Sequence, residues 1–125
     1  MPSLSHIGQI AVVVHDLDRA TAFYRDQLGM QFLFAAPPRL AFFDAGGTRL
    51  MLDAAAEPGF DHPGSILYFD VPNVQQAHAE LKARGVPFVD EPHIVAPMPG
   101  GDLWMTFFKD PDGNTMAIMA VQPRG

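Results

Sequence analysis

Several residue types and patterns are missing from this chain, and each absence narrows what the protein can do. Cysteine is absent, which excludes a disulfide framework and thiolate chemistry. Basic residues number 8 against 14 acidic ones, and the net charge of −6 argues against a nucleic-acid partner, because phosphate binding needs a basic surface. No apolar run approaches the roughly 20 residues that span a bilayer, and no signal peptide is evident. We therefore expect a cytoplasmic protein without a membrane or nucleic-acid partner.

The residues that are present favour a small globular fold. Hydrophobic residues make up 48% of the 125 positions, as in ordinary globular proteins, and this length suits one compact domain over residues 1–125. Twelve prolines and eleven glycines indicate many tight turns and short elements.

The stretch from Gln9 to Phe32 organises the chain. Residues 10–14 are apolar and rich in valine, as a buried strand should be. Asp16 follows as the N-cap of a predicted helix, and Gly29 fits the left-handed position just past the helix end. The stretch therefore predicts a strand, a helix and a turn into a second strand.

A similar stretch occurs a second time in the sequence. A shift of 57 residues aligns its strand and helix with a second copy at 67–88. The aligned pairs are Val14 with Val71, Asp16 with Asn73 and, after a one-residue deletion, Gly29 with Gly85 and Phe32 with Phe88. Two copies are too few for a solenoid, so we expect a closed pair of modules, one at about 7–56 and one at about 64–121.

Each module should run strand–helix–strand–strand–strand. Beyond the repeated stretches, hairpin turns are expected at 45–47 and 110–113, where glycine accepts positive φ. Residues 91–102 contain three prolines and are predicted to be a long loop or a broken strand. The remaining predicted strands are 31–35, 40–44, 48–53, 65–71, 87–90, 103–109 and 114–121, with the second helix at 74–84.

Three groups of residues carry a resemblance to a known family. They are Asp16-Leu17, Ala20, Phe23-Tyr24-Arg25-Asp26 and Leu28-Gly29; Ala79-Glu80-Leu81 and Arg84-Gly85-Val86; and Lys109-Asp110-Pro111-Asp112-Gly113-Asn114. With the doubled module order, they resemble the vicinal oxygen chelate superfamily, which includes glyoxalase I, bleomycin-resistance proteins, methylmalonyl-CoA epimerases and extradiol dioxygenases. The resemblance implies an α+β fold in which two βαβββ modules pair into a curved mixed sheet, with helices outside and a ligand cup inside.

The resemblance also implies where a metal would be held. Metal-dependent members place four ligands in the cup, and the matching positions here are Gln9, Met51, Ile66 and Ala117. Hard divalent cations need oxygen and imidazole ligands, and only Gln9 could supply one. We therefore expect a member that lacks the metal site, with no metal and no cofactor.

Strand alternation then gives the side chains that could face the cup. Trp104 is assigned inward with Thr106 and Phe108, His93 precedes the proline-rich segment, and His15 and His78 are expected on the surface. The candidate ligand-binding residues are Gln9, Phe43, Met51, Tyr68, His93 and Trp104. No catalytic residue can be named from the sequence.

Two functions remain open at this point. The first is a metal-independent protein that binds a small apolar or aromatic molecule, as bleomycin-resistance proteins do. The second is an enzyme: a lyase or isomerase of the glyoxalase I or epimerase type, or a dioxygenase-like enzyme. A filled core without a pocket is the structural alternative. The resemblance further implies a homodimer, for which Phe42, Leu50 and Leu52 could supply the interface.

Overall fold

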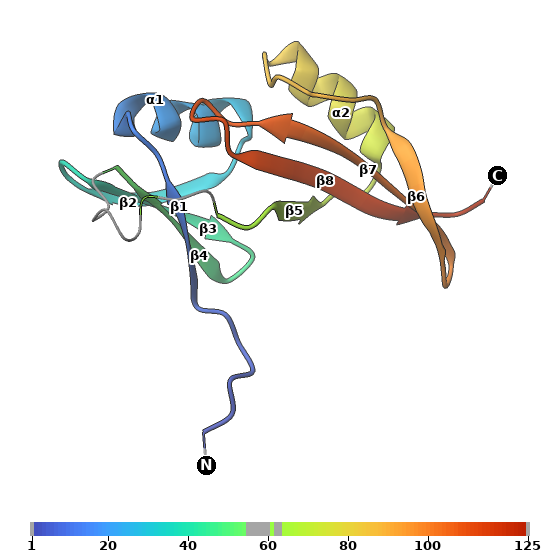
Figure 1. The fold of residues 1–125 in the computed structure, drawn as a ribbon, viewed down its shortest axis with the longest axis horizontal. Helices are drawn as coiled ribbons and strands as arrows, with labels where there is room; N and C mark the ends of the chain where they lie inside the picture. The colour runs from blue at the N-terminus through green and yellow to red at the C-terminus, as the bar shows by residue number, and fades with distance from the viewer. Residues whose placement is uncertain (1, 55–60, 62–63, 125) are drawn as a thin grey trace. The chain divides into compact units, whose positions relative to one another are not determined.

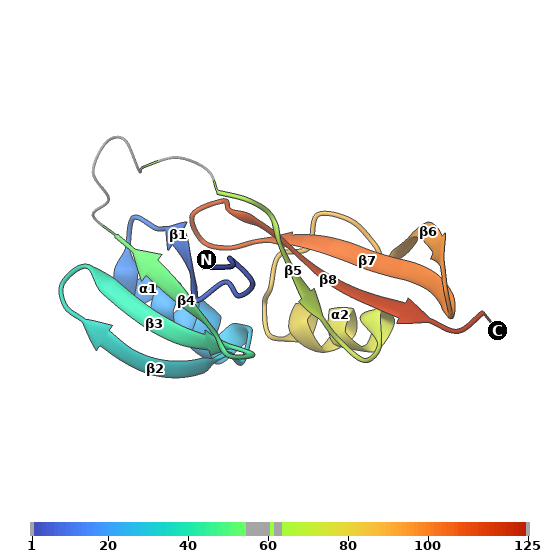
Figure 2. The ribbon, with the colours of Figure 1, turned by 90° about the horizontal axis from the view of Figure 1, so that it is seen from below.

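A computed structural model describes residues 2–54, 61 and 64–124. The chain divides into two compact units, Met1–Gly64 and Ser65–Gly125, which we call unit 1 and unit 2. Each unit holds one helical segment and one four-stranded mixed sheet, so the fold is α+β (Figures 1 and 2). No helix in the described part of the chain is long and apolar enough to cross a membrane.

Unit 1 has the predicted strand–helix–strand–strand–strand order, and its helical segment lies over one face of its sheet (Figure 1). Its sheet order is β1-β4-β3-β2. The helix α1 passes directly into a π-helical turn, η1, in which the Leu28 amide donates to the Phe23 carbonyl at 3.0 Å. The elements are β1 (Gln9–Val13), α1 (Leu17–Ala22), η1 (Phe23–Gln27), β2 (Gln31–Ala36), β3 (Leu40–Ala45) and β4 (Thr48–Asp53).

Unit 2 repeats this arrangement. Its sheet order is β5-β8-β7-β6, and α2 packs on one face against β7 and β8 (Figure 2). The elements are β5 (Leu67–Asp70), α2 (Val74–Ala83), β6 (His93–Met98), β7 (Gly101–Lys109) and β8 (Thr115–Gln122).

The register confirms the 57-residue repeat. In unit 1 the edge strand β1 runs parallel to β4, with Ala11 opposite Met51. In unit 2 the edge strand β5 runs parallel to β8, with Tyr68 opposite Ala117. Residues 11 and 68 are 57 positions apart, so the first strand of each module occupies the equivalent edge of its sheet.

The predicted helix ends are also confirmed. The Asp16 carboxylate accepts a hydrogen bond from the Arg19 amide at 3.1 Å, and the Asn73 side chain accepts one from the Gln76 amide at 2.8 Å. Past the helices, Gly29 and Gly85 have φ values of 71° and 88°, which glycine adopts without the clash that a Cβ would cause.

Each unit buries its core between the helix and one face of the sheet. Equivalent aromatic pairs lie there: Phe32 and Phe43 in unit 1, and Phe88 and Phe108 in unit 2, each with ring centroids 5.5 Å apart in an edge-to-face arrangement. Phe43 and Phe108 are 0% and 1% exposed. The largest fully buried side chains are Tyr24, Phe43, Phe108, Leu50, Leu52, Met116, Val14, Val74 and Thr106.

One strand lies elsewhere than predicted. Residues 87–90 were expected to form a strand, but they contribute only the isolated bridge between Phe88 and Phe108. The strand β6 instead lies at 93–98, inside the segment predicted to be a loop or a broken strand. Pro97 is tolerated because β6 is at the edge of the sheet, where a missing amide donor breaks no inner ladder.

Candidate functional site

Each sheet has a second face, opposite its helix, which we call the open face of the unit. Because successive side chains of a strand point to opposite faces, residues paired across the strands share one face. In unit 1 this register joins Met51, Ala11 and Phe42 on the open face, and Gln9 lies with Arg49. In unit 2 it joins Tyr68, Ala117 and Phe107.

A hydrogen-bonded amide and an aromatic stack occupy the open face of unit 1. The Gln9 Oε1 accepts from Arg49 Nε at 2.9 Å, and the Gln9 Nε2 donates to the Met51 sulfur at 3.6 Å. The Arg49 guanidinium carbon lies 4.8 Å from the centre of the Phe42 ring, and Phe42 stacks on Phe34 with centroids 4.6 Å apart. Neighbouring side chains therefore satisfy the amide, and the guanidinium is held over a ring.

A row of rings crosses the open face of unit 2. Tyr68 meets Phe107 edge-on at 6.0 Å, and His93 lies nearly parallel to Phe107 at 6.5 Å. Ala117 lies between Tyr68 and Phe107 in the strand order and has only a methyl group. Tyr68 is 46% exposed. The row thus presents aromatic surface to solvent.

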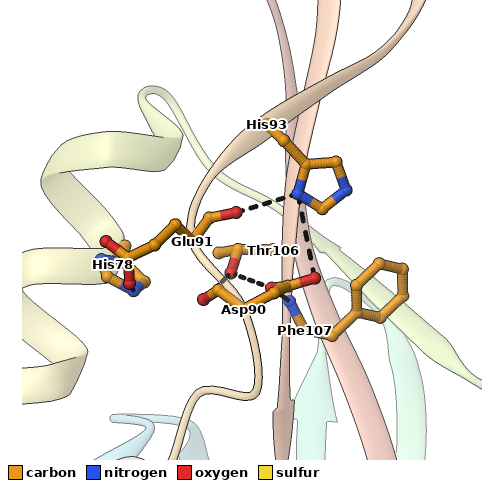
Figure 3. A network of polar contacts seen from close by, with 6 residues as sticks. All are labelled: His78, Asp90, Glu91, His93, Thr106 and Phe107. Atoms are coloured by element: carbon orange, nitrogen blue, oxygen red, sulfur yellow. Dashed lines mark hydrogen bonds and ion pairs between the residues drawn. The ribbon is translucent and has the colours of Figure 1, made fainter.

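The end of this row is fixed by Asp90 (Figure 3). Its Oδ1 accepts from the Thr106 hydroxyl at 2.6 Å and from the Phe107 amide at 2.9 Å, which ties the carboxylate to β7. Its Oδ2 lies 3.8 Å from His93 Nδ1, and the same nitrogen is 2.9 Å from the Glu91 carbonyl oxygen. Two neighbours therefore orient the His93 ring beside Phe107.

His78 is buried, although the sequence had suggested a position on the surface. It is 7% exposed, and its ring packs on Phe88 with centroids 4.4 Å apart, on the helix side of the sheet. Its Nε2 makes no hydrogen bond within the described residues, and Glu91 Oε2 is 3.8 Å away (Figure 3). The prediction of a solvated histidine was wrong because His78 falls on the apolar face of α2.

Two of the six candidate residues lie on helix-side faces. Phe43 is fully buried against Tyr24 and Phe32, so the open face of β3 carries its neighbour Phe42 instead. Trp104 shares its face with Thr106 and Phe108, and that face is turned toward α2, so the inward assignment was wrong. The other four candidates divide between the open faces: Gln9 and Met51 in unit 1, Tyr68 and His93 in unit 2.

Sequence reasoning did not assign Phe42, Phe107 or Asp90 to the site, and it offered Phe42 only for a dimer interface. The first two could have been found from the turns. Gly46 and Gly47 form a two-residue hairpin turn that sets Phe42 opposite Met51, and the turn at 110–113 sets Phe107 opposite Ala117. Asp90 could not be identified from a turn in this way, because the segment around it was predicted to be a strand.

The positions that the resemblance associates with a metal do not fit one. Unit 1 supplies an amide and a thioether at Gln9 and Met51, and unit 2 supplies an alkyl side chain and a methyl at Ile66 and Ala117. The Asp53 carboxylate, on the Met51 face, is engaged by both Arg39 Nε and Nη2 at 2.8 and 3.1 Å. Among the described residues, no three His, Asp or Glu side chains come together as a metal site. A hard divalent cation would lack ligands here.

Two copies of a strand–helix–three-strand unit, each with its first strand parallel to its last at one edge, define a class of α+β proteins. Residues 6–118 match the family model described as Glyoxalase/Bleomycin resistance protein/Dioxygenase superfamily. The chain belongs to that superfamily, as its resemblance to vicinal oxygen chelate proteins implied.

Individual relatives agree with this assignment. The uncharacterized protein YetH of Bacillus subtilis (strain 168) is 26% identical over 124 residues, which cover 92% of this chain and 98% of YetH. The structure resembles a lactoylglutathione lyase from Agrobacterium tumefaciens, with a TM-score of 0.68, 24% identity and 94% of each chain covered. It also resembles a superfamily member from Sphaerobacter thermophilus, with a TM-score of 0.73, 25% identity, and 93% and 97% of the two chains covered.

Proposed function

We propose that this protein binds a small apolar or aromatic molecule on its open sheet faces without a metal ion. The observation that carries the proposal is the row of Tyr68, Phe107 and His93 on the open face of unit 2. A planar ligand stacked on such rings gains about 0.5–1.5 kcal/mol per ring pair beyond the burial of its surface.

The open face of unit 1 supports the same reading. Phe34 is 48% exposed and stacks on Phe42, so it offers a ring to a ligand. Next to Phe42, Arg49 and its hydrogen-bonded partner Gln9 supply a polar point that their mutual hydrogen bond already orients. Ligand-binding sites commonly combine apolar and aromatic surface with a few fixed polar groups of this kind.

The donor chemistry supports binding without a metal. The superfamily name covers glyoxalases, bleomycin-resistance proteins and dioxygenases, and the four metal positions of this chain offer one neutral oxygen donor among them. A binding function uses the rings and the amide as they stand, whereas a metal-dependent reaction would require ligands that these four residues do not provide.

Ligand titration tests the proposal. A library of small aromatic compounds is screened by thermal shift, and hits are measured by isothermal titration calorimetry. Phe107→Leu should weaken binding about three- to tenfold by removing one stacking partner. Trp104→Leu is the matched control, because it removes a ring from the same strand but from the opposite face.

The outcome separates binding from a filled core. If no compound shifts the melting temperature of the wild-type protein, the proposal is wrong. If Trp104→Leu weakens binding as much as Phe107→Leu while both variants fold, the ligand does not use the open face. Trp104 fluorescence is not a direct report on this face, so calorimetry is the primary readout.

A homodimer and a cytoplasmic location are the remaining parts of the proposal. Leu50 and Leu52 are 2% and 0% exposed and Phe42 is 7% exposed, so these residues do not supply an interface. Exposed apolar side chains on β6, such as Ile94 and Met98, are better candidates. Light scattering should give twice the chain mass of 13.6 kDa, and the chain mass itself would contradict the dimer.

A further inference from the structure

We propose that His93, in the neutral form of its ring, accepts a hydrogen bond from the ligand through Nε2. This makes the ligand a planar aromatic compound that carries a weakly acidic O–H or N–H group. The inference rests on the proposed binding function and adds the chemical class of the molecule bound.

The tautomer of His93 follows from its partner. Nδ1 lies 2.9 Å from the carbonyl oxygen of Glu91, and a carbonyl oxygen can only accept a hydrogen bond. Nδ1 therefore carries the proton. In the neutral form of the imidazole this is the only N–H, so Nε2 then holds a lone pair and can accept a hydrogen bond.

A carboxylate reinforces this tautomer. Asp90 Oδ2 lies 3.8 Å from Nδ1. The negative charge of the carboxylate favours a proton on Nδ1 and disfavours a lone pair there. Asp90 is a fixed partner, because its other oxygen accepts from the Thr106 hydroxyl and from the Phe107 amide. Figure 3 shows the second ring nitrogen of His93 on the far side of the ring from Asp90 and Glu91.

The position of the ring places the acceptor beside the aromatic row. His93 lies at 27° to Phe107, and its side chain is 45% exposed. A planar ligand that lies against Phe107 and Tyr68 would therefore meet Nε2 at its edge. The other histidine of this network does not offer the same arrangement, since His78 is buried on the helix side with its Nε2 toward Glu91.

The first experiment needs no ligand. Long-range ¹H–¹⁵N NMR, recorded in mildly alkaline buffer where an ordinary imidazole is neutral, distinguishes the two tautomers. The proposal expects the Nδ1–H form for His93, assigned by the loss of its signals in His93→Phe. A spectrum that shows the Nε2–H form overturns it.

The second experiment compares 2-naphthol with 2-methoxynaphthalene. The two compounds share one ring system, and only the naphthol donates a hydrogen bond. The wild-type protein should bind the naphthol about three- to tenfold tighter, as one hydrogen bond allows. His93→Phe keeps a ring but removes the acceptor, so it should bind both compounds equally. His15→Phe, at an exposed histidine of unit 1, should keep the wild-type preference.

The outcomes separate this inference from the proposed function. Equal affinity for both compounds in the wild type, or a preference that survives in His93→Phe, overturns the role of His93 and leaves aromatic binding intact. If neither compound nor any other aromatic compound in the library binds, the proposed function is wrong and the inference falls with it.

Discussion

Units 1 and 2 share a scaffold but differ on their open faces. On the helix side the same ring pair recurs at the same 5.5 Å separation. On the open face, unit 1 has Ala11 opposite Met51, whereas unit 2 has Tyr68 opposite Ala117. The larger side chain of the pair is therefore on the inner strand β4 in unit 1 and on the edge strand β5 in unit 2. The helix side is constrained by packing, and the open face is where the two copies have diverged.

The difference extends to the segment that follows the helix in each unit. Two residues beyond Phe32 and Phe88, unit 1 has Phe34 and unit 2 has Asp90. Phe34 stacks on Phe42, while Asp90 accepts hydrogen bonds from Thr106 and Phe107. One copy therefore presents a ring where the other presents a carboxylate that orients a histidine. Equivalent positions of a repeat can serve unlike chemistry when no core packing fixes them.

The largest expected effect tests whether the two cores are equivalent. Phe43→Ala and Phe108→Ala should each lower the free energy of unfolding by about 3–5 kcal/mol, because both rings are fully buried. Urea denaturation measures it. Phe34→Ala, at a half-exposed ring, is the control and should cost less than either. If one of these two substitutions leaves the free energy of unfolding nearly unchanged, the cores of the two units are not equivalent.

The next effect is specific to unit 2. Asp90→Ala should lower the free energy of unfolding by about 1–3 kcal/mol, because the Phe107 amide loses its carboxylate partner. It should also shift the His93 ring signals in NMR spectra. Phe34→Ala in unit 1 should leave those signals unchanged. If Asp90→Ala moves neither stability nor the His93 signals, Asp90 does not orient the ring.

A smaller effect compares the two helix caps. Asp16→Ala and Asn73→Ala each remove one side-chain acceptor from a helix N-terminus and should cost about 0.5–2 kcal/mol. Conservative Asp16→Asn and Asn73→Asp variants should retain most of the stability. A large loss in one of the conservative variants would mean that the cap has a further role in that unit.

The smallest effect concerns the π-helical turn of unit 1. The hydrogen bond from Arg25 lowers the pKa of Asp26 below its ordinary value of 3.8. Because the pKa of Asp26 is lowered in the folded state, its ionised form stabilises the fold at pH values above the ordinary pKa. This stabilisation is lost as the pH falls through the folded-state pKa. Both side chains are exposed to solvent, so Asp26→Asn should barely change the melting temperature at neutral pH. A carboxyl titration by NMR that gives Asp26 an ordinary pKa would contradict the pairing.

Local signals in the sequence sufficed for most of the fold. The caps at Asp16 and Asn73 and the positive-φ glycines at 29 and 85 mark helix ends by short-range chemistry, so they could be read directly. The repeat then placed β1 and β5 at equivalent sheet edges. The strand β6 was missed because the three prolines of residues 91–102 suggested a break, and the one inside the strand, Pro97, is acceptable because β6 lies at the sheet edge.

The candidate site was harder to predict, because it depends on which face of a strand meets the helix. Phe43 and Trp104 were assigned to the open faces. Because side chains alternate along a strand, an error of one residue in the assignment puts a side chain on the opposite face. The orientation of His93 depends on a carboxylate and a carbonyl from a segment without regular structure. No sequence period describes that arrangement.

The parallel edge strands also determine how the chain folds. Gln9 pairs with a residue 40 positions later, and Tyr68 pairs with Ala117, 49 positions later, whereas the hairpins β3–β4 and β7–β8 close through short turns. Long loops cost more entropy to close, so the hairpins should form first and β1 and β5 should dock last. Their amides should be among the first of the sheet to exchange with deuterium, and a ligand that contacts Gln9 or Tyr68 should slow that exchange.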